Sequence, residues 1–533
     1  MFARLSAYWR QDRPHYITLM SLILLGIGLR LAYITRGMRS DEADTFIQFA
    51  SAPLDEALTS YTIPNNHLLN TFFIHLVYHA LGNEPWVVRL PALLAGIVVL
   101  PAVYLVARRL YDRHVALLTL GLTATSAAMI EFSVNARGYS LLALATLALL
   151  GLAHQLQRAP RLALWAAFAV VAALGFYTVP TMLYPMGLVG LYLMIGIGVH
   201  QAGAARWRVW GQAVGALAAG AALTVLLYIP VIVVSGWDSL TGNQFVQPHS
   251  WSGFLWRFEA WPVAFQDFVM WQFPQPLIWL MWAAFWMGLI AHRGLAGDWV
   301  LWPLLGAAWT VVLVIIHRNI PPTRTWTAYA PLFYMVVAAG AVYVLRSWPT
   351  LPHIRRRRLR LASLGSAVVL ALIIISANTV NESEQTGKAA LAEDAALLLR
   401  DHYLQPGDRI LAPLRTGAPL QYYLDYHQAP RVYDMRTEWD DDPFFIADIQ
   451  RFDGDIYVFA EPYDTVDDLF KIFFNLQRPT TPVRLELLHD FGSNRLYRLS
   501  IAPAGYEIAR QGAVSSGATM VVRGVTSSTE PSG

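Results

Sequence analysis

The sequence predicts an all-α membrane protein of about eleven transmembrane helices, followed by a small α/β domain. The chain of 533 residues is 56% hydrophobic and 14% charged, and its mean hydropathy is +0.40, which is too apolar for a soluble protein of this size. Its apolar residues gather into segments long enough to cross a bilayer. After residue 380 the apolar runs shorten and Asp and Glu become more frequent.

Each transmembrane helix needs about 20 predominantly apolar residues. The segments that satisfy this rule are residues 16–35, 86–107, 115–132, 140–156, 162–178, 182–200, 209–234, 276–292, 298–316, 327–346 and 361–379. The basic residues Arg4, Arg10 and Arg13 precede the first segment, so we expect a signal anchor rather than a cleaved signal peptide. Together these segments form a predicted membrane domain over residues 1–380.

Clusters of Arg predict the orientation, because cytoplasmic loops carry an excess of positive residues. The clusters fall in alternate connections, at Arg108-Arg109 with Arg113, Arg158 with Arg161, Arg206 with Arg208, Arg293, and the run of Arg355 to Arg358. A cytoplasmic N-terminus places every cluster inside. We therefore expect a multi-pass protein of the cell membrane whose C-terminal domain is extracytoplasmic.

Residues 67–82 have helical spacing but are short for a span, and they include His67, Asn70, His75 and His79. Counting them as a span would place Arg108-Arg109 outside and reverse the sidedness of every later cluster. An interfacial helix on the outer leaflet, within a first outer loop of residues 36–85, fits better.

The long outer loop of residues 235–275 is dense in Trp and Phe. Trp favours the membrane interface, so this loop is expected to be a membrane-surface anchor. The functional alternative is a lid or wall over a cavity for a lipid headgroup.

Residues 381–507 predict an extracytoplasmic α/β domain, because strand-like and helix-like stretches alternate there. The strand-like stretches are RILAP, RVYDM, DIYVFA, VRLELLHDF and RLYRLS, and the helix-like ones are GKAALAEDAALLLRDHYL and TVDDLFKIFFNLQ. Residues 508–533 are rich in Ser, Gly and Thr and are expected to be a disordered tail. Cys is absent, which excludes disulfides and thiolate chemistry. No long basic surface with interleaved aromatics indicates nucleic-acid binding.

Polar residues in the outer loops are the candidates for chemistry. Asp41 and Glu42 follow the first segment closely, where a carboxylate can act as a general base at the membrane surface. Taken alone, such a pair is more simply a solvated loop charge. Arg in an outer loop runs against the topology rule, and binding of a lipid phosphate is a reason for its presence, since guanidinium pairs with phosphate through two parallel hydrogen bonds.

Two outer loops carry such Arg residues. The stretch EFSVNARGYS contains Arg137 and Tyr139, and HRNIPPTRTW contains Arg318 and Arg324 around two prolines that stiffen the loop. Simpler explanations are pairing of Arg137 with Glu131 or a lipid headgroup, and snorkelling of the other two Arg side chains. Two further residues are candidates for substrate binding, although surface histidines are more common than ligands: His67 and Arg89.

The sequence resembles bacterial GT-C fold glycosyltransferases, the broad group that includes protein mannosyltransferases and lipid A aminoarabinose transferases. The resemblance covers most of residues 10–350. It rests on SDEADTF, PNNHLLN, EPWVVRLPALLAG followed by YLVARRLYDRHVALL, FSVNARGYSLLAL and RNIPPTRTWTAYAPL, in this order. The run PNNHLLN departs from the family's more usual His-Pro-Pro.

The resemblance implies transfer of a sugar from a polyprenyl-phosphate carrier to an acceptor on the extracytoplasmic face. It implies that Asp41, or else Glu42, is the catalytic base. The residues it assigns to the donor phosphate are Arg137, Tyr139, Arg318 and Arg324. The later loop lacks an obvious second acidic pair of the kind that metal-dependent relatives use, so no cofactor is expected to be required. A divalent cation is not indicated, but the sequence leaves metal dependence open. One displacement with a carboxylate base predicts inversion at the anomeric carbon.

The expected partners are the lipid-linked sugar donor and membrane lipid, with the acceptor left open. The main alternative is a transporter or flippase of lipid-linked sugars. Transporters place ionisable residues near the midplane or contain paired repeats, whereas here charges lie at the ends of segments and no duplication is evident. A non-catalytic membrane scaffold is a further alternative.

Overall fold

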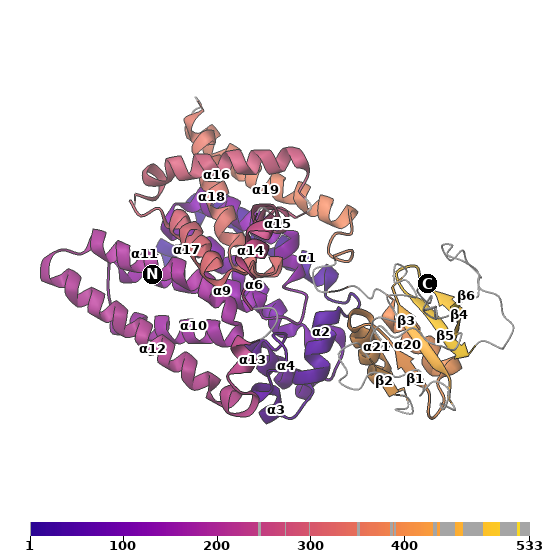
Figure 1. Ribbon diagram of the computed structural model, residues 1–533. Helices are drawn as coiled ribbons and strands as arrows, with labels where there is room; N and C mark the ends of the chain where they lie inside the picture. Colours follow the sequence, from indigo (N-terminus) through magenta and orange to yellow (C-terminus); the bar gives the residue numbers. More distant parts are fainter. Residues whose placement is uncertain are drawn as a thin grey trace, which may run out of the picture. The chain divides into compact units, whose positions relative to one another are not determined.

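The structure is a computed structural model and describes residues 2–242, 247–258, 260–271, 273–297, 299–348, 352–383, 387, 391–429, 434–436, 454–461, 483–501 and 520–522. The chain divides into two compact units (Figure 1). The helical unit comprises Met1–Thr35, Gln48–Gly82 and Trp86–Glu382, and the C-terminal unit comprises Arg36–Ile47, Asn83–Pro85 and Ser383–Gly533.

The helical unit contains a helix over every segment predicted from hydropathy, so the predicted positions of the helices are confirmed. The long helices are α1 (Phe2–Tyr33), α6 (Leu90–Leu110), α7 (Arg113–Ala124), α9 (Tyr139–Leu156), α10 (Leu162–Thr178), α11 (Leu183–His200), α12 (Gly203–Ser235), α16 (Gln275–Ala296), α17 (Trp302–His317), α18 (Ala330–Ser347) and α19 (Pro352–Ser376). Shorter helices are α3 (Leu54–Thr59), α4 (Leu68–Leu81), α5 (Pro85–Val88), α8 (Ala127–Glu131), α13 (Asp238–Thr241), α14 (Trp251–Phe258), α15 (Ala260–Val269), η2 (Pro180–Met182) and η3 (Thr323–Ala328).

Among the described residues, seven helical segments are long and apolar enough to cross a membrane. They are Asp12–Tyr33, Leu90–Leu110, Tyr139–Leu156, Pro180–His200, Gly203–Ser235, Ala330–Ser347 and Pro352–Ser376. The helices α4, α10 and α17 are shorter but also apolar. The protein is therefore a multi-pass membrane protein. The expected helix at residues 67–82 is present as α4, and its place at the interface stays a prediction.

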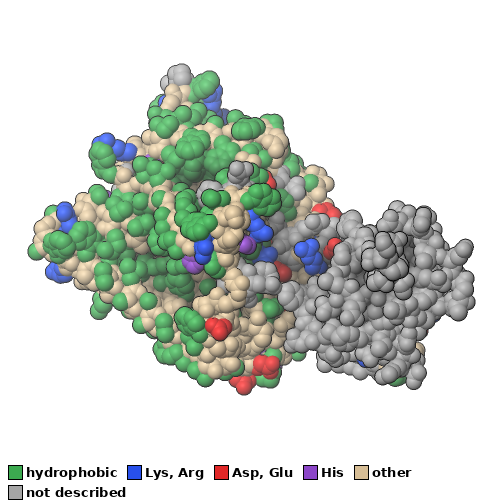
Figure 2. Space-filling view, in the orientation of Figure 1, with side chains coloured by type: hydrophobic (Ala, Val, Ile, Leu, Met, Phe, Trp, Pro, Cys, Tyr) green, Lys and Arg blue, Asp and Glu red, His purple; other side chains and the backbone are tan. Residues whose placement is uncertain are grey.

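The surface of the helical unit is apolar over broad areas (Figure 2). Large hydrophobic side chains such as Leu24, Val233 and Ile290 expose more than half of their area. Helix α12 is the most exposed of the seven candidate spans, because only 17% of its most apolar window is buried inside the protein. Contiguous apolar surface of this kind suits lipid rather than water.

The core of the helical unit is built around α7, which packs against α1, α6, α18 and α19. Helix α18 is buried along most of its length and lies against α16. Small residues permit this contact, because a Cβ atom on Gly288 would meet the carbonyl of Val336, and one on Gly340 would meet the carbonyl of Ala284. Close backbone approach at glycine is a common way for membrane helices to associate.

Ion pairs join the ends of several helices of the bundle. Arg113 lies 2.8 Å from Asp12, and Arg346 lies 2.6 Å from Asp112. The rule on Arg clusters predicts that these residues lie on one side of the membrane, and the pairing brings their helix ends together. That this side is cytoplasmic stays a prediction.

The C-terminal unit contains a six-stranded mixed sheet in the order β2-β1-β3-β5-β4-β6. The strands are β1 (Arg409–Leu411), β2 (Asp434–Arg436), β3 (Ile456–Ala460), β4 (Val483–Asp490), β5 (Arg495–Ile501) and β6 (Met520–Val522). Strand β1 pairs in parallel with β2 and β3, and the other pairings are antiparallel. The helical elements are α20 (Ala392–Leu398), η4 (Leu399–Tyr403) and α21 (Leu414–Tyr426).

The predicted α/β character of this region is confirmed, because each strand-like stretch contributes a strand. The helix expected at residues 387–404 is present as α20 and η4. The helix expected at residues 465–477 lies outside the described residues. Strand β6 falls inside the stretch expected to be disordered, since residues 520–522 pair with β4. The remainder of residues 508–533 lies outside the described residues.

Part of the first outer loop belongs to the C-terminal unit, whereas the sequence suggested that the whole loop belongs to the membrane domain. Helix α2 (Ser40–Thr45) packs against α21. The backbone N–H of Met38 donates to the Tyr423 hydroxyl at 3.0 Å, and the rings of Phe46 and Tyr422 meet edge to face. These contacts hold the predicted acidic motif on the C-terminal unit.

Candidate active site

Three loops of the helical unit, each predicted to be an outer loop, bring basic side chains together. His67 immediately precedes α4, Arg137 lies in the turn before α9, and Arg324 belongs to η3. Burial, followed by the positive charges of Arg137 and Arg324, holds the pKa of His67 well below its usual range. The histidine is therefore neutral and close to both guanidinium groups. We call these three residues the basic cluster.

Residues 137 to 139 surround the imidazole of His67. The Nη2 atom of Arg137 lies 3.3 Å from Nε2, and the backbone N–H of Gly138 donates to Nδ1 at 2.8 Å. The Tyr139 ring meets the imidazole edge to face, with 4.9 Å between centroids. A side chain at position 138 would press on His67 and on Thr178, which explains the glycine there.

The Arg137 side chain is 1% exposed and has polar and aromatic neighbours. Its Nη1 donates to the carbonyl of Asn65 at 3.1 Å, and its guanidinium carbon lies 5.9 Å from the Tyr139 ring centroid. Tyr61 is also buried close to this group. Burial raises the pKa of Tyr61 to about 12, although the charge of Arg137 opposes this rise. A buried guanidinium in such surroundings is suited to bind an anion.

Two other predicted Arg residues lie elsewhere in the helical unit. Arg318 ends α17 in the left-handed backbone region, with φ of 48°, and its guanidinium carbon lies 5.4 Å from the ring centroid of Trp251. Arg89 is fully buried at the start of α6, and its Nη1 donates to the carbonyl of Ile34 at 2.7 Å. This bond stabilises the end of α1, which is a structural contact. The ligand roles of both residues stay predictions.

The acidic pair occupies α2 in the C-terminal unit. Glu42 is fully buried, and its Oε1 accepts the backbone N–H of Arg39 at 2.8 Å, in the manner of a capping box. Asp41 is only partly buried. Its backbone carbonyl accepts the hydroxyl of Thr45 at 2.7 Å. Since Glu42 serves the helix start, Asp41 is the stronger candidate for a base.

The helix that follows the acidic pair changes its winding. Residues Phe46–Ala50 form a π-helical turn, η1. Such turns are rare and frequently accompany functional sites. The turn also contains the point where the chain passes from the C-terminal unit to the helical unit, after Ile47.

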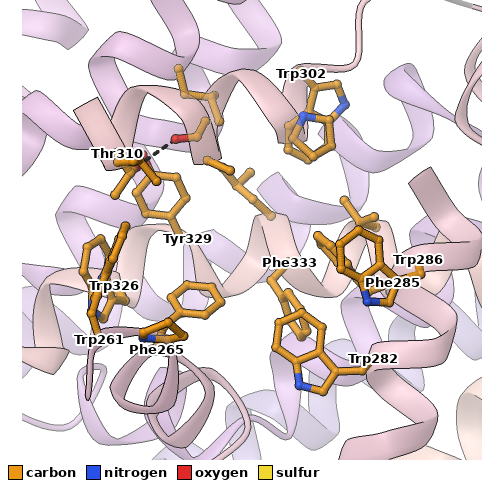
Figure 3. A pocket seen from close by; sticks show the side chains of 18 residues that line it. Trp261, Phe265, Trp282, Phe285, Trp286, Trp302, Thr310, Trp326, Tyr329 and Phe333 are labelled. Atoms are coloured by element: carbon orange, nitrogen blue, oxygen red, sulfur yellow. Dashed lines mark hydrogen bonds between the residues drawn. The ribbon is translucent and has the colours of Figure 1, made fainter. Parts of the chain in front are cut away.

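A cavity of about 370 Å³ lies among α15, α16, α17, α18 and η3, and its lining is almost entirely apolar (Figure 3). The aromatic side chains around it are Trp261, Phe265, Trp282, Phe285, Trp286, Trp302, Trp326, Tyr329 and Phe333. The Phe285 and Phe333 rings stack with 5.2 Å between centroids. One lining residue, Trp326, follows Arg324 of the basic cluster by two residues in η3. This space fits a hydrocarbon chain.

The Trp-rich loop has features of both predicted roles. Trp237, Trp251 and Trp256 each expose more than half of their area, as expected of an interfacial anchor. Trp261 instead lines the cavity, as expected of a wall.

No group of three or more His, Cys, Asp or Glu side chains within the described ranges could hold a metal ion. Glu131 is fully buried, and its Oε1 accepts the Asn135 side-chain amide at 3.4 Å. Tyr61 and Gly138 were not among the residues predicted for the site. Gly138 could have been predicted from its position between Arg137 and Tyr139 at the start of a helix.

Residues 66–233 match the family described as dolichyl-phosphate-mannose-protein mannosyltransferase. The fold is similar to that of ArnT from Cupriavidus metallidurans in the apo state, with a TM-score of 0.57, 13% identity, and coverage of 90% of this chain and 97% of that one. The protein has the GT-C glycosyltransferase fold.

Two ligand-bound structures are also similar. ArnT from Cupriavidus metallidurans bound to undecaprenyl phosphate gives a TM-score of 0.55 and 13% identity, covering 91% of this chain and 97% of that one. The oligosaccharyltransferase AglB from Archaeoglobus fulgidus, in complex with an inhibitory peptide and a dolichol-phosphate, gives 0.50 and 11%, covering 94% and 75%. Comparison with curated proteins gave no match.

The predicted GT-C fold is confirmed, and the family match covers residues 66–233. The family match and the fold together support a membrane glycosyltransferase. The matched residues include His67, Arg89, Arg137 and Tyr139, whereas Asp41 precedes them and Arg324 follows them.

Proposed function

We propose that this GT-C protein transfers a sugar from a polyprenyl-phosphate carrier to an acceptor hydroxyl on the extracytoplasmic face of the cell membrane. The observation that carries the proposal is the basic cluster, assembled from three outer loops, beside an apolar aromatic cavity. A polyprenyl phosphate joins an anion to a branched hydrocarbon chain, and these two features suit both of its parts. The ligands of the similar ArnT and AglB structures are also polyprenyl phosphates, which supports the same donor class.

The cluster supplies positive charge for the leaving group. As the bond between the anomeric carbon and the phosphate oxygen breaks, negative charge grows on the phosphate. Arg137 and Arg324 stabilise that charge, with the Tyr139 ring supporting Arg137. Because Arg137 is buried, its interaction with the phosphate is stronger than in water. The isoprene units next to the phosphate occupy the aromatic cavity.

Asp41 is the proposed base. It removes the proton of the acceptor hydroxyl, whose oxygen attacks the anomeric carbon on the face opposite the phosphate. The carrier leaves as polyprenyl phosphate, and the configuration at the anomeric carbon inverts. General-base catalysis of this kind contributes roughly 10²–10⁴ in rate.

The test is sugar release from a panel of radiolabelled polyprenyl-phosphate sugars by the purified protein in nanodiscs, with and without membrane extract as a source of acceptor. Asp41→Asn removes the base without changing side-chain size, and we expect turnover to fall about 10²-fold or more while donor binding persists. Asp55→Asn is the matched control, since Asp55 is an exposed acid in the same loop. We expect it to keep full turnover.

The outcomes separate the candidate functions. Turnover with one donor, lost in Asp41→Asn alone, supports the transferase and names its sugar. Donor binding with movement across the bilayer but no sugar release, in the presence of extract, would favour a transporter. Turnover that persists in Asp41→Asn would remove this residue from the base role, and Glu42→Gln would then be measured in the same assay.

A further inference from the structure

The contacts of His67 determine where its proton lies. The backbone N–H of Gly138 donates to Nδ1 at 2.8 Å, so Nδ1 carries a lone pair and no hydrogen. Burial and two neighbouring guanidinium groups hold the pKa of His67 well below its usual range, so the ring is neutral. A neutral imidazole has one N–H group. That group is therefore Nε2–H.

This tautomer creates a contact between two donors. The Nε2 atom lies 3.3 Å from Nη2 of Arg137. Guanidinium nitrogens only donate hydrogen bonds, so Nη2 cannot accept the Nε2 hydrogen. Facing donors in a buried place are unfavourable unless an acceptor lies beside both. An anionic oxygen satisfies that condition, and it would be drawn there by the charge of Arg137 and of nearby Arg324.

We propose that His67 Nε2–H and the Arg137 guanidinium form a paired donor site that holds one phosphate oxygen of the lipid carrier, with Gly138 fixing the tautomer. His67 is then a direct ligand of the donor phosphate rather than a packing residue. The inference rests on the proposed use of a polyprenyl-phosphate donor and deepens it, because it assigns a neutral hydrogen-bond donor alongside the two positive charges.

The surroundings of the imidazole fit this role. The Tyr139 ring lies edge to face against it, and the hydrogen bond from the Gly138 N–H to Nδ1 orients the ring. Arg137 is separately fixed by its bond to the Asn65 carbonyl. Both donors are thus oriented before the anion arrives, which reduces the entropy lost on binding.

Two substitutions separate the roles of the two ring nitrogens. His67→Asn places an acceptor near Nδ1, so it keeps the bond from Gly138 but has no donor at the position of Nε2. His67→Gln reaches that position with an amide N–H but does not provide the Nδ1 acceptor. Both are neutral, as the histidine is. The measured quantity is the dissociation constant of undecaprenyl phosphate for the full-length protein in nanodiscs.

We expect His67→Asn to weaken binding about tenfold, the typical effect of losing one hydrogen bond to a charged group. His67→Gln should stay within about threefold of wild type. Binding of the uncharged polyprenol should change in neither variant, because it lacks the phosphate. Matched controls are His79→Asn and His79→Gln, at an exposed histidine of the same helix α4, and they should bind like wild type.

The reverse order would overturn the inference. If His67 only supports the turn at Gly138, then His67→Asn retains affinity and His67→Gln loses it together with thermal stability. An equal loss of affinity for polyprenyl phosphate and for polyprenol would also contradict the inference, since the effect would then not depend on the phosphate. Wild-type protein that binds polyprenol and polyprenyl phosphate equally would reject the proposed donor class itself, and the paired site with it.

Discussion

The basic cluster and the acidic helix α2 differ in how the chain holds them. The cluster belongs to the helical unit and is assembled from three loops far apart in sequence, with His67 and Arg137 each 1% exposed. Helix α2 has only six residues and is held by the C-terminal unit, through its contacts with α21. The comparison teaches that the phosphate-binding and proton-accepting parts of the proposed chemistry depend on separate parts of the fold. A substitution in one part should therefore impair its role and leave the role of the other part intact.

The largest expected effect is at the basic cluster. Arg137→Gln removes a buried charge, and we expect carrier binding to weaken about 100-fold, as for a charge-assisted pair, with turnover falling in parallel. The measurement is the dissociation constant of undecaprenyl phosphate. Arg158→Gln, at an exposed Arg, should have no effect on binding. Retention of affinity by Arg137→Gln would contradict the assignment of the cluster to the phosphate.

A smaller effect is expected at the support of α2. Gly387 has φ of +78°, and a Cβ there would strike Ser40 at the start of α2. Gly387→Ala should therefore shift α2 and lower turnover about tenfold, while carrier binding stays unchanged.

Gly492→Ala supplies the matched control, because Gly492 has the same φ of +78° but open space around it. This variant undergoes the same backbone strain and should keep its turnover. Equal loss of turnover in both variants would show that general destabilisation of the C-terminal unit, not displacement of α2, is the cause.

The smallest effect concerns the aromatic cavity. Ala307 lines it, and Ala307→Phe should occupy part of the space and weaken polyprenyl phosphate binding about threefold to tenfold. Ala218→Phe, on the exposed face of α12, is the control. An unchanged or improved affinity in Ala307→Phe would place the isoprenoid chain elsewhere.

The positions of the helices could be predicted from the sequence, because hydropathy shows where membrane helices form. The sidedness inferred from the Arg clusters stays a prediction. The same rules predicted that His67, Arg137 and Arg324 share one face, and the structure brings them together. Helix α21 was missed, since Gly417 and Pro419 within it are typical of turns.

Other features depend on contacts between distant residues, which no local pattern reveals. Tyr61 and Gly138 belong to the site only because the first loop meets the turn before α9. The union of α2 with the C-terminal unit joins residues more than 300 positions apart, such as Met38 and Tyr423. The different roles of Asp41 and Glu42 became clear only from the hydrogen bond between the Arg39 backbone N–H and Glu42. This cap could not be predicted from the sequence, because Arg is rarely the first residue of a helix.

Burying His67 and Arg137 has a consequence for selectivity. Inorganic phosphate offers the same oxygen atoms as the carrier, but it meets a closed surface and brings nothing that offsets the cost of opening it. A lipid-linked phosphate also places its hydrocarbon chain in the cavity that Trp326 lines, and the burial of that chain offsets the same cost. Abundant small anions would thus be excluded because they cannot offset the free energy needed to reach the buried donors, although they could form the same hydrogen bonds.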